Sequence, residues 1–375
     1  MSMCSMCHTV NFCFCIKDKA YYMSKYIERK IGPSLTSKLL SNIDRNVVSE
    51  LKVGKDYTYS MLTDSHLEVI NKELVENLFS HIPLNNSCVG FVKKKSYLDL
   101  LEPHRYSKKF TRLDISSFFH SISISDVKAS LTPYVNPLFL DKEKKISTLE
   151  KIIECITYDV PLTSSNTIFR GKKILPMGFS SSPVISNVVF RKIDIQIQKY
   201  CIENKIIYTR YADDMLFSSN KELVSQVEFI NKIQSLVSQL SLRINERKTI
   251  TTSGHISLNG YVIDGSSGTI RLSNKKLSRI NKITHQLLVR SKSPSSVAKK
   301  LYGYSISQYN FKYSYSKEFF EQFCKDQLHN KIAGNRAYLI SVLKFNDRYE
   351  CICPDYLKKS KVMLDRLNEI LDNWR

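Results

Sequence analysis

The sequence predicts an α+β protein in which helices and short strands are mixed along the chain. Apolar residues recur at helical spacing over several segments, whereas β-forming residues gather in short runs bounded by polar turns. A chain of 375 residues can bury a large core and divide into two or three subdomains.

In the N-terminal half, residues 24–101 are expected to be mostly helical with loops. Within them, residues 65–79 have the apolar spacing of an amphipathic helix, carried by Leu67, Ile70, Leu74, Val75 and Leu78. Residues 110–119 begin as a strand and continue as a helix, and residues 161–178 are polar and irregular.

In the C-terminal half, Ser182 and Pro183 begin a predicted helix that runs to about Glu203, because proline is well tolerated in a first turn. A β-hairpin is expected over residues 206–218, followed by a helix over 221–240 and short strands over 241–250 and 255–264. From Ser273 onward the pattern is helical to the end.

The chain is strongly basic, with 56 Lys and Arg against 35 Asp and Glu, for a formal net charge of +21. Residues 265–375 hold 21 of the basic and 9 of the acidic residues, and Tyr and Phe are frequent there between Tyr302 and Phe320. Basic residues interleaved with aromatic rings suit phosphate contacts and base stacking, so a nucleic acid is the expected partner. The plainer alternatives are a soluble basic protein and aromatic side chains that belong to a helical core.

No segment approaches the ~18 apolar residues that span a bilayer, and the N-terminus lacks the pattern of a signal peptide. We therefore expect a cytoplasmic protein without membrane contact, whose ten cysteines are mostly reduced. An N-terminal cluster could be read as zinc ligands, but its spacing matches no zinc pattern and plain thiols are preferred. Its members are Cys4, Cys7, His8, Cys13 and Cys15.

Two adjacent carboxylates, Asp213 and Asp214, lie between two runs of β-forming residues, where a hairpin turn is expected. Adjacent acids repel each other and offer nothing to a core, so a divalent cation is the simplest means of neutralising them. Two-metal phosphoryl transfer needs several carboxylates around two cations that lie ~3.5–4 Å apart. Asp114, at the end of a predicted strand, is the candidate third acid, although alone it also fits an ordinary helix N-cap.

Three short motifs follow one another in a distinctive order. Asp114 comes first, Leu175-Pro-Met-Gly178 with Ser182-Pro183 and Asn187 comes second, and Tyr211-Ala-Asp-Asp214 comes third. Each motif is weak alone, but the order and spacing together resemble the reverse transcriptases, and within them the bacterial retron-type branch. The resemblance covers roughly residues 89–264.

Some family features are missing from the chain. Of two retron signatures, only His104 and Gly260 remain, in Leu100-Leu-Glu-Pro-His104 and Leu258-Asn-Gly-Tyr261. The fingers segment that clamps the triphosphate in many reverse transcriptases is not recognisable, since no clear arginine follows Lys52-Val-Gly-Lys55. Arg112 is a substitute by position only.

The resemblance implies a role for each matching residue. Asp114 and Asp213 would ligate both of two Mg²⁺ ions, or Mn²⁺ in their place, and Asp214 would support the site. Lys248, in the motif that spans residues 242–249, would approach the triphosphate and donate a proton to the leaving pyrophosphate. The catalytic residues implied are therefore Asp114, Asp213, Asp214 and Lys248, and the metal ligands are the three aspartates.

Further roles concern the substrates. Phe119 matches the steric gate that excludes a ribose 2′-OH, although a core phenylalanine is the alternative and Phe118 could be that core residue. The implied substrate-binding residues are Arg112, Phe119, Met177, Gly178 and Tyr211. The implied nucleic-acid-binding residues are His104, Asn187, Asn259, Gly260, Lys275, Lys276, Lys299 and Lys300.

As a retron-type enzyme the chain would have the right-hand architecture of polymerases, with an N-terminal helical region and fingers over residues 1–105, a palm of antiparallel sheet and packed helices over 106–264, and a basic helical thumb over 265–375. It would copy a structured noncoding RNA into a short DNA, using dNTPs, and keep the branched RNA–DNA product bound. A separate effector protein for anti-phage defence and a bacterial cytoplasmic location are also implied. The alternatives are a defence-associated reverse transcriptase outside the retrons, with another primer or template, and a non-catalytic RNA-binding scaffold.

Overall fold

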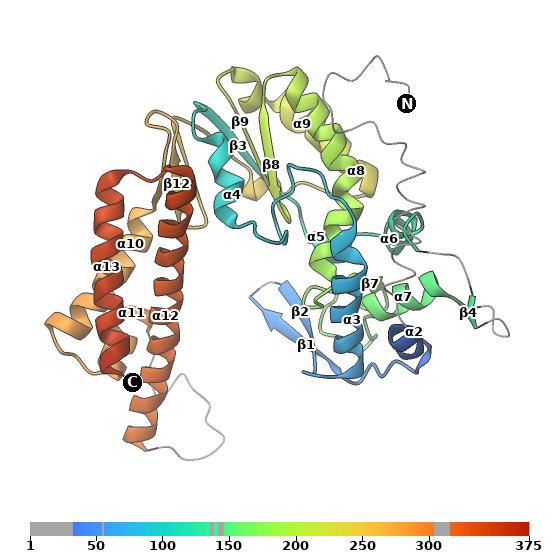
Figure 1. Cartoon of the computed structure of the whole chain (residues 1–375), viewed down its shortest axis with the longest axis horizontal. Helices are drawn as coiled ribbons and strands as arrows, with labels where there is room; N and C mark the ends of the chain where they lie inside the picture. The colour runs from blue at the N-terminus through green and yellow to red at the C-terminus, as the bar shows by residue number, and fades with distance from the viewer. Residues whose placement is uncertain (1–32, 55, 136–138, 142–145, 304–315, 375) are drawn as a thin grey trace. The chain divides into compact units, whose positions relative to one another are not determined.

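The computed structural model describes residues 33–54, 56–135, 139–141, 146–303 and 316–374 (Figure 1). The N-terminal cysteines and His8 lie outside this range, as do Lys55 and the aromatic-rich stretch 304–315. Contacts divide the chain into two units. Of the described residues, the first unit holds those in 1–100, 111–217 and 222–251, and the second holds those in 101–110, 218–221 and 252–375.

Helices and strands are mixed along the chain, as predicted. The helices are α2 (Pro33–Leu40), α3 (His66–Asn77), α4 (Tyr97–Leu101), α5 (Phe118–Ser121), α6 (Ile124–Leu131), α7 (Thr148–Ile156), α8 (Ser182–Glu203), α9 (Val227–Val237), α10 (Asn274–Thr284), α11 (Pro294–Tyr302), α12 (Lys317–Tyr349) and α13 (Pro354–Asn373). The strands are β1 (Val48–Val53), β2 (Asp56–Met61), β3 (Lys109–Asp114), β4 (Phe139–Asp141), β5 (Ile146–Ser147), β6 (Tyr158–Asp159), β7 (Lys173–Ile174), β8 (Ile207–Tyr211), β9 (Asp214–Ser219), β10 (Ile250–Ser253), β11 (His255–Leu258), β12 (Tyr261–Asp264) and β13 (Thr269–Leu272). Short 3₁₀ turns link several of them, among them Glu246–Lys248.

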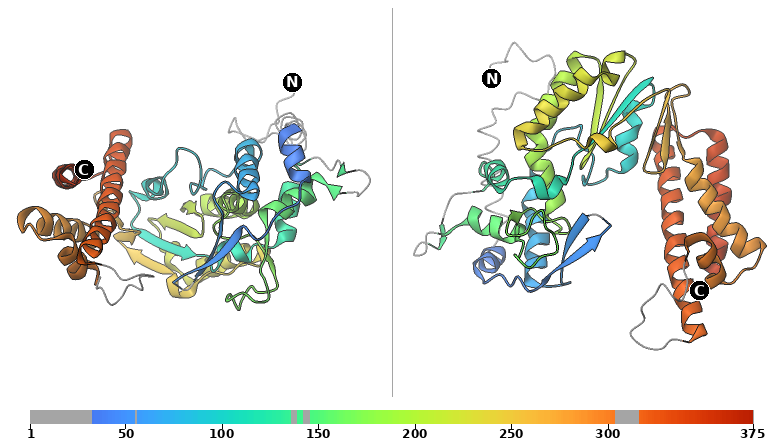
Figure 2. Two further views of the ribbon diagram at one scale, coloured as in Figure 1. Left: turned by 90° about the horizontal axis from the view of Figure 1, so that it is seen from below. Right: turned by 180° about the vertical axis from the view of Figure 1, so that it is seen from behind.

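A four-stranded sheet with the strand order β10-β3-β9-β8 carries the predicted catalytic acids. Helices α8 and α9 cover one face of it, and Figures 1 and 2 show α8 running alongside β8. The rings of Tyr208 on β8 and Phe217 on β9 stack with centroids 4.9 Å apart, and Phe229 of α9 packs edge-on against Phe217 at 5.1 Å. This aromatic packing fixes the sheet on its helices and so fixes the hairpin at its end.

The N-terminal part of the first unit differs from the expectation of helices and loops. Residues 48–61 form an antiparallel hairpin, β1–β2, with Val53 opposite Asp56 at its turn. Most side chains of β1 are exposed, so burial does not impose the clear apolar alternation on which strand prediction relies. The strand expected over 241–250 was also wrong, because its C-terminal end forms the 3₁₀ turn Glu246–Lys248 and β10 begins only at Ile250.

The second unit combines the antiparallel sheet β11-β12-β13 with helices α10 to α13. Helices α12 and α13 pack side by side (Figures 1 and 2). The Ile270 amide of β13 donates to the carbonyl of Cys351, in the link between α12 and α13, over 2.8 Å. Among the described helices, none combines the length and the apolar character needed to cross a membrane. The fingers, palm and thumb boundaries stay a prediction.

Candidate active site

The paired aspartates lie at a tight hairpin turn, as predicted. Strand β8 ends at Tyr211 and β9 begins at Asp214, so Ala212 and Asp213 form the turn. Ala212 has a φ of 54°, in the left-handed region that residues other than glycine seldom adopt. Asp114 ends the neighbouring strand β3, and the amide of the next residue, Ile115, donates to the Asp213 carbonyl over 3.1 Å. The structure therefore brings Asp114 and Asp213 together at one end of the sheet.

The carboxylates of Asp114 and Asp213 are only partly satisfied. Oδ1 of Asp114 accepts a hydrogen bond from the Lys248 ammonium at 3.0 Å, while its Oδ2 is buried without a hydrogen-bond partner. Burial raises the pKa of Asp213 to about 6, with further contributions from the charges of Asp214 and Asp114. A bound cation would stabilise both groups, because it would give the unpaired oxygen of Asp114 a partner and would favour the ionised form of Asp213.

A backbone hydrogen bond of Asn245 brings Lys248 to this site. The Asn245 amide donates to the Asp114 carbonyl at 2.7 Å, which places the 3₁₀ turn Glu246–Lys248 beside β3. The hydrogen bond to Asp114 raises the pKa of the Lys248 ammonium above its ordinary value, so this side chain stays protonated at neutral pH. Its position agrees with the predicted role as a proton donor, which stays a prediction.

Asp214 is held differently from Asp213. The guanidinium of Arg112 pairs with Asp214 Oδ1 through Nε, at 2.8 Å, and through a second nitrogen. The hydroxyl of Tyr97 donates to Asp214 Oδ2 at 3.4 Å. Because the Arg112 charge is engaged by Asp214, we revise the interpretation of Arg112 from a triphosphate ligand to a residue that holds this carboxylate.

In the part of the chain that the structure describes, no three His, Cys, Asp or Glu side chains converge as a ready-made metal site. Lys248 pairs with Asp114 and Arg112 pairs with Asp214, so these two aspartates already have cationic partners in the metal-free protein. The donor set still fits a hard divalent ion such as Mg²⁺, which prefers carboxylate oxygens and keeps several waters. The unpaired Oδ2 of Asp114 and the carboxylate of Asp213 are the groups we expect to hold it.

A buried polar network supports the turn between β8 and β9, and the sequence did not reveal this network. Arg210 is fully buried and pairs with both oxygens of Asp194, at 2.9 and 2.7 Å. The same guanidinium donates to the Ala212 carbonyl at 2.9 Å and to Asn187 Oδ1 at 3.0 Å. Arg210 and Asp194 are sixteen positions apart on a strand and a helix, so no local pattern connects them.

Gly90 is a second support that the sequence did not reveal. Its carbonyl accepts from Asn187 Nδ2 at 2.7 Å, and a Cβ built on it would lie 2.6 Å from the Ala212 nitrogen. Only a residue without a side chain can approach the turn this closely. Asn187, predicted to bind nucleic acid, is fully buried in this network, so its side chain positions the hairpin rather than contacting a strand.

Aromatic rings surround the turn that carries Asp213. Phe119 is half-buried while Phe118 is buried, which confirms Phe118 as the core residue of the pair. The ring of Phe91, which is 46% exposed, lies 6.5 Å from that of Phe119 and 5.6 Å from that of Tyr211. Tyr97 contacts Tyr211 from another side at 5.3 Å. The predicted gate and the signature tyrosine therefore belong to one cluster.

The segment between Phe91 and Tyr97 carries Lys93, Lys94 and Lys95, which are exposed. Both ends of this short loop contact the β8–β9 hairpin: the Phe91 ring packs near the Tyr211 ring, and the Tyr97 hydroxyl donates to Asp214. The basic triplet that begins three residues after Gly90 was the available sequence signal, in a region where helical structure was expected.

The Leu-Pro-Met-Gly segment packs against the β1–β2 hairpin. The Met177 carbonyl accepts from the Tyr59 amide at 2.7 Å. Gly178 has a φ of 115°, and a Cβ there would lie 2.4 Å from the Tyr59 carbonyl oxygen. The glycine is therefore required both by the backbone conformation and by the close approach of β2. Met177 is half-buried and Gly178 is exposed.

The other predicted nucleic-acid-binding residues lie in the second unit. His104 is fully buried, bonds to Ser218 Oγ at 2.7 Å and has its pKa lowered to about 3 by burial, so direct contact with a nucleic acid is the wrong interpretation. Asn259 and Gly260 form the turn between β11 and β12, whose Gly260 carbonyl accepts from the Ser273 amide at 2.7 Å. The basic side chains predicted to bind nucleic acid are exposed at Lys275, Lys299 and Lys300, and half-buried at Lys276.

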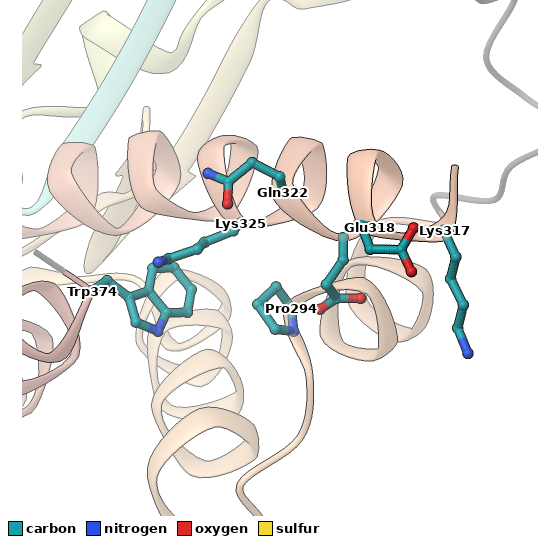
Figure 3. A pocket seen from close by; sticks show the side chains of 7 residues that line it. Pro294, Lys317, Glu318, Gln322, Lys325 and Trp374 are labelled. Carbon is teal, nitrogen blue, oxygen red and sulfur yellow. The ribbon is translucent and has the colours of Figure 1, made fainter. Parts of the chain in front are cut away.

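A pocket lies in the second unit, where α11, α12 and α13 meet (Figure 3). Lys325 and Trp374 face each other there, with the ammonium 6.0 Å from the indole centroid. Glu321 accepts from the Ser295 amide at 3.0 Å. The lining mixes both signs of charge and includes none of the predicted catalytic residues, so we assign the pocket no part in the chemistry.

The fold brings Asp114, Asp213 and Asp214 to one end of a four-stranded sheet, with the Lys248 ammonium 3.0 Å from Asp114. Residues 52–313 match the reverse transcriptase (RNA-dependent DNA polymerase) family. The chain belongs to this family.

Among individual proteins, the chain is 28% identical to the retron Ec73 reverse transcriptase of Escherichia coli over 198 residues, which are 51% of this chain and 59% of that protein. It is 31% identical to the retron Ec83 reverse transcriptase of E. coli over 157 residues, which are 41% of this chain and 46% of that protein. The retron Ec86 reverse transcriptase of E. coli is 28% identical over 185 residues, which are 49% of this chain and 50% of that protein. The chain thus spans about half the length of the curated relatives it matches. Among solved structures, a telomerase from Candida albicans in complex with a TWJ fragment of telomeric RNA is 12% identical, with a TM-score of 0.43 over 94% of this chain and 70% of that one.

Proposed function

We propose that the protein is an RNA-directed DNA polymerase of the retron type. It would copy a structured noncoding RNA into a short DNA from dNTPs and hold a branched RNA–DNA product. The observation that carries the chemistry is the buried, unpartnered Oδ2 of Asp114 beside Asp213, whose pKa is raised to about 6 chiefly by burial. These groups call for a cation, and membership of the reverse transcriptase family supplies the reaction that uses it.

In this proposal Asp114 and Asp213 would hold two Mg²⁺ ions, which Mn²⁺ could replace. When bound, the ions would activate the primer hydroxyl and offset the charge that develops on the triphosphate. Asp214 stays paired with Arg112 and stiffens the turn. The Lys248 ammonium, 3.0 Å from Asp114, donates a proton to the leaving pyrophosphate oxygen.

Substrate contacts follow from the side chains around the acids. The exposed ammonium groups of Lys93 and Lys94 would meet the triphosphate, because their loop is attached at both ends to the β8–β9 hairpin, whereas the Lys95 ammonium lies 3.5 Å from the Asp99 carboxylate. Phe119 would exclude the ribose 2′-OH, with Met177 and Gly178 beside the incoming sugar. The turn Asn259–Gly260 and the lysines of α10 and α11 would contact the RNA and its DNA product through phosphates.

The retron assignment rests on the similarity to relatives that are named retron reverse transcriptases. It brings with it a cytoplasmic location in a bacterium, a role in anti-phage defence and a separate effector protein. These finer statements are part of the proposal.

Primer extension on an RNA template with Mg²⁺ tests the activity. The wild-type protein should incorporate dNTPs, and Asp213→Asn should reduce incorporation by at least a thousandfold, while His66→Phe, at an exposed position of α3, should leave it unchanged. Equal, background-level incorporation by wild type and Asp213→Asn would leave only the RNA-binding scaffold.

The nucleic acid that copurifies with the protein tests the retron assignment separately. A branched RNA–DNA molecule, cut by a debranching enzyme and by RNase, would support it. Unbranched or untemplated DNA from an active enzyme would favour a defence polymerase outside the retrons.

A further inference from the structure

His120 follows the predicted gate residue, Phe119, on the short helix α5. Its ring is half-buried and packs edge-on between two aromatic side chains, Tyr59 at 5.6 Å and Phe169 at 5.2 Å between ring centroids. Its Nε2 lies 3.2 Å from the amide nitrogen of Met177. Because an amide N–H can only donate, Nε2 is the acceptor and Nδ1 carries the ring proton.

The Met177 backbone is thus held from two sides. Its N–H donates to His120 of α5, and its carbonyl accepts from the Tyr59 amide of β2 at 2.7 Å. The ring of Tyr59 also contacts His120. A single imidazole therefore connects the gate helix, the Leu175–Gly178 segment and the β1–β2 hairpin.

We infer that His120 is a positioning residue that fixes the separation between the Phe119 ring and Met177, and thereby determines how well a deoxynucleotide is selected and bound. The inference rests on the proposed polymerase function and deepens it. Phe119 and His120 are consecutive on one helical turn, so a change in the tie to Met177 moves the gate relative to the segment opposite. Among the described residues, neither the Phe119 side chain nor the Met177 side chain links α5 to the Leu175–Gly178 segment, whereas the His120 imidazole does.

The acceptor role requires a neutral imidazole. Burial lowers the pKa of His120 to about 4, against an opposing effect of the Asp56 carboxylate, so the ring is neutral at the pH of polymerase assays. The rings of Tyr59 and Phe169 pack against the His120 imidazole and keep it from water, which disfavours its charged form.

Three substitutions separate the hydrogen bond from the packing. His120→Phe keeps a ring between Tyr59 and Phe169 but removes the acceptor, so the Met177 N–H loses its partner. His120→Gln keeps an acceptor oxygen near the position of Nε2 and loses the ring. His120→Ala loses both, and His66→Phe is the matched control, because His66 is exposed on α3 of the same unit.

The assay is steady-state incorporation of dNTP and rNTP by the full chain on an RNA template, with the melting temperature of each variant recorded. We expect His120→Phe to raise the KM for dNTP about tenfold, the size of one lost hydrogen bond. It should lower the preference for dNTP over rNTP severalfold, with kcat changed less than threefold. His120→Gln should stay within threefold of wild type in both KM and preference.

Two results would overturn the inference in an active wild-type enzyme. One is a KM and a dNTP preference in His120→Phe within twofold of wild type. The other is a fall in kcat and melting temperature in every His120 variant with KM and preference unchanged, which would mean a structural role only. If His120→Phe does not fold, His120→Gln decides by the same criteria. An inactive wild type would instead refute the proposed function.

Discussion

Replacing Asp213 with asparagine should stabilise the metal-free protein while abolishing polymerisation. The folded-state pKa of Asp213 is raised from 3.8 to about 6, with burial as the largest cause. A raised carboxyl pKa means that stability is fully present below pH 3.8 and is lost as the pH rises through about 6. Asparagine resembles the protonated acid, so the variant escapes this loss.

The magnitude follows from the shift. One pKa unit corresponds to 1.36 kcal/mol, and two units to about 3 kcal/mol. Because the side chain keeps partial contact with solvent, which screens its neighbours, we expect Asp213→Asn to gain about 1–3 kcal/mol at pH 8 and almost nothing at pH 4.

Urea unfolding in EDTA at several pH values between 4 and 8 measures this difference. Asp214→Asn is the matched control with the opposite sign, because it removes the negative charge that pairs with the Arg112 guanidinium and should cost about 1–3 kcal/mol. A stability difference for Asp213→Asn that does not grow with pH, or a less stable variant at pH 8, would refute the electrostatic reasoning.

Three further predictions concern the same site. Mg²⁺ affinity, measured by calorimetry, should fall as the pH drops below about 6, because protons compete for the Asp213 carboxylate; an affinity constant from pH 5 to 8 would contradict this. Asp194→Ala should cost about 3–5 kcal/mol in denaturant unfolding, since it leaves the fully buried Arg210 charge unpaired, and a loss under 1 kcal/mol would mean that the network is solvated. Gly90→Ala should cost about 1–3 kcal/mol and slow single-turnover incorporation, because its Cβ would meet the Ala212 nitrogen at 2.6 Å. Gly334→Ala, with nothing within 4 Å of the new Cβ, is the control and should be neutral or slightly stabilising.

Much of the catalytic hairpin could be predicted because its signals are local. The β-forming runs around Asp213 and Asp214 predicted the turn, and the helix that begins at Ser182 was predicted from Pro183 and apolar periodicity. The β1–β2 hairpin could not be predicted in the same way, because most side chains of β1 are exposed and burial imposes no clear alternation on that strand.

The predicted roles depended on burial more than on spacing. His104 and Asn187 stand at family-like positions, yet both are fully buried and support the fold. Arg112 was placed near the acids by its position in the chain, but only the folded structure shows that its guanidinium binds Asp214. A one-dimensional pattern carries no information about which polar side chain the fold removes from solvent.

The sequence by itself determined the class of this protein, the three acids, the lysine that accompanies them and the basic character of the C-terminal region. These conclusions rest on residue types and on the order of short motifs, which are properties of the sequence alone. Only the tertiary structure decided which acid is strained and which is paired, and it did so through partners distant in sequence. Burial is the largest cause of the raised pKa of Asp213, followed by the charges of the adjacent Asp214 and of Asp114, which lies 99 positions earlier in the chain. Arg210, fully buried on β8, holds the turn and is itself paired with the fully buried Asp194 of α8.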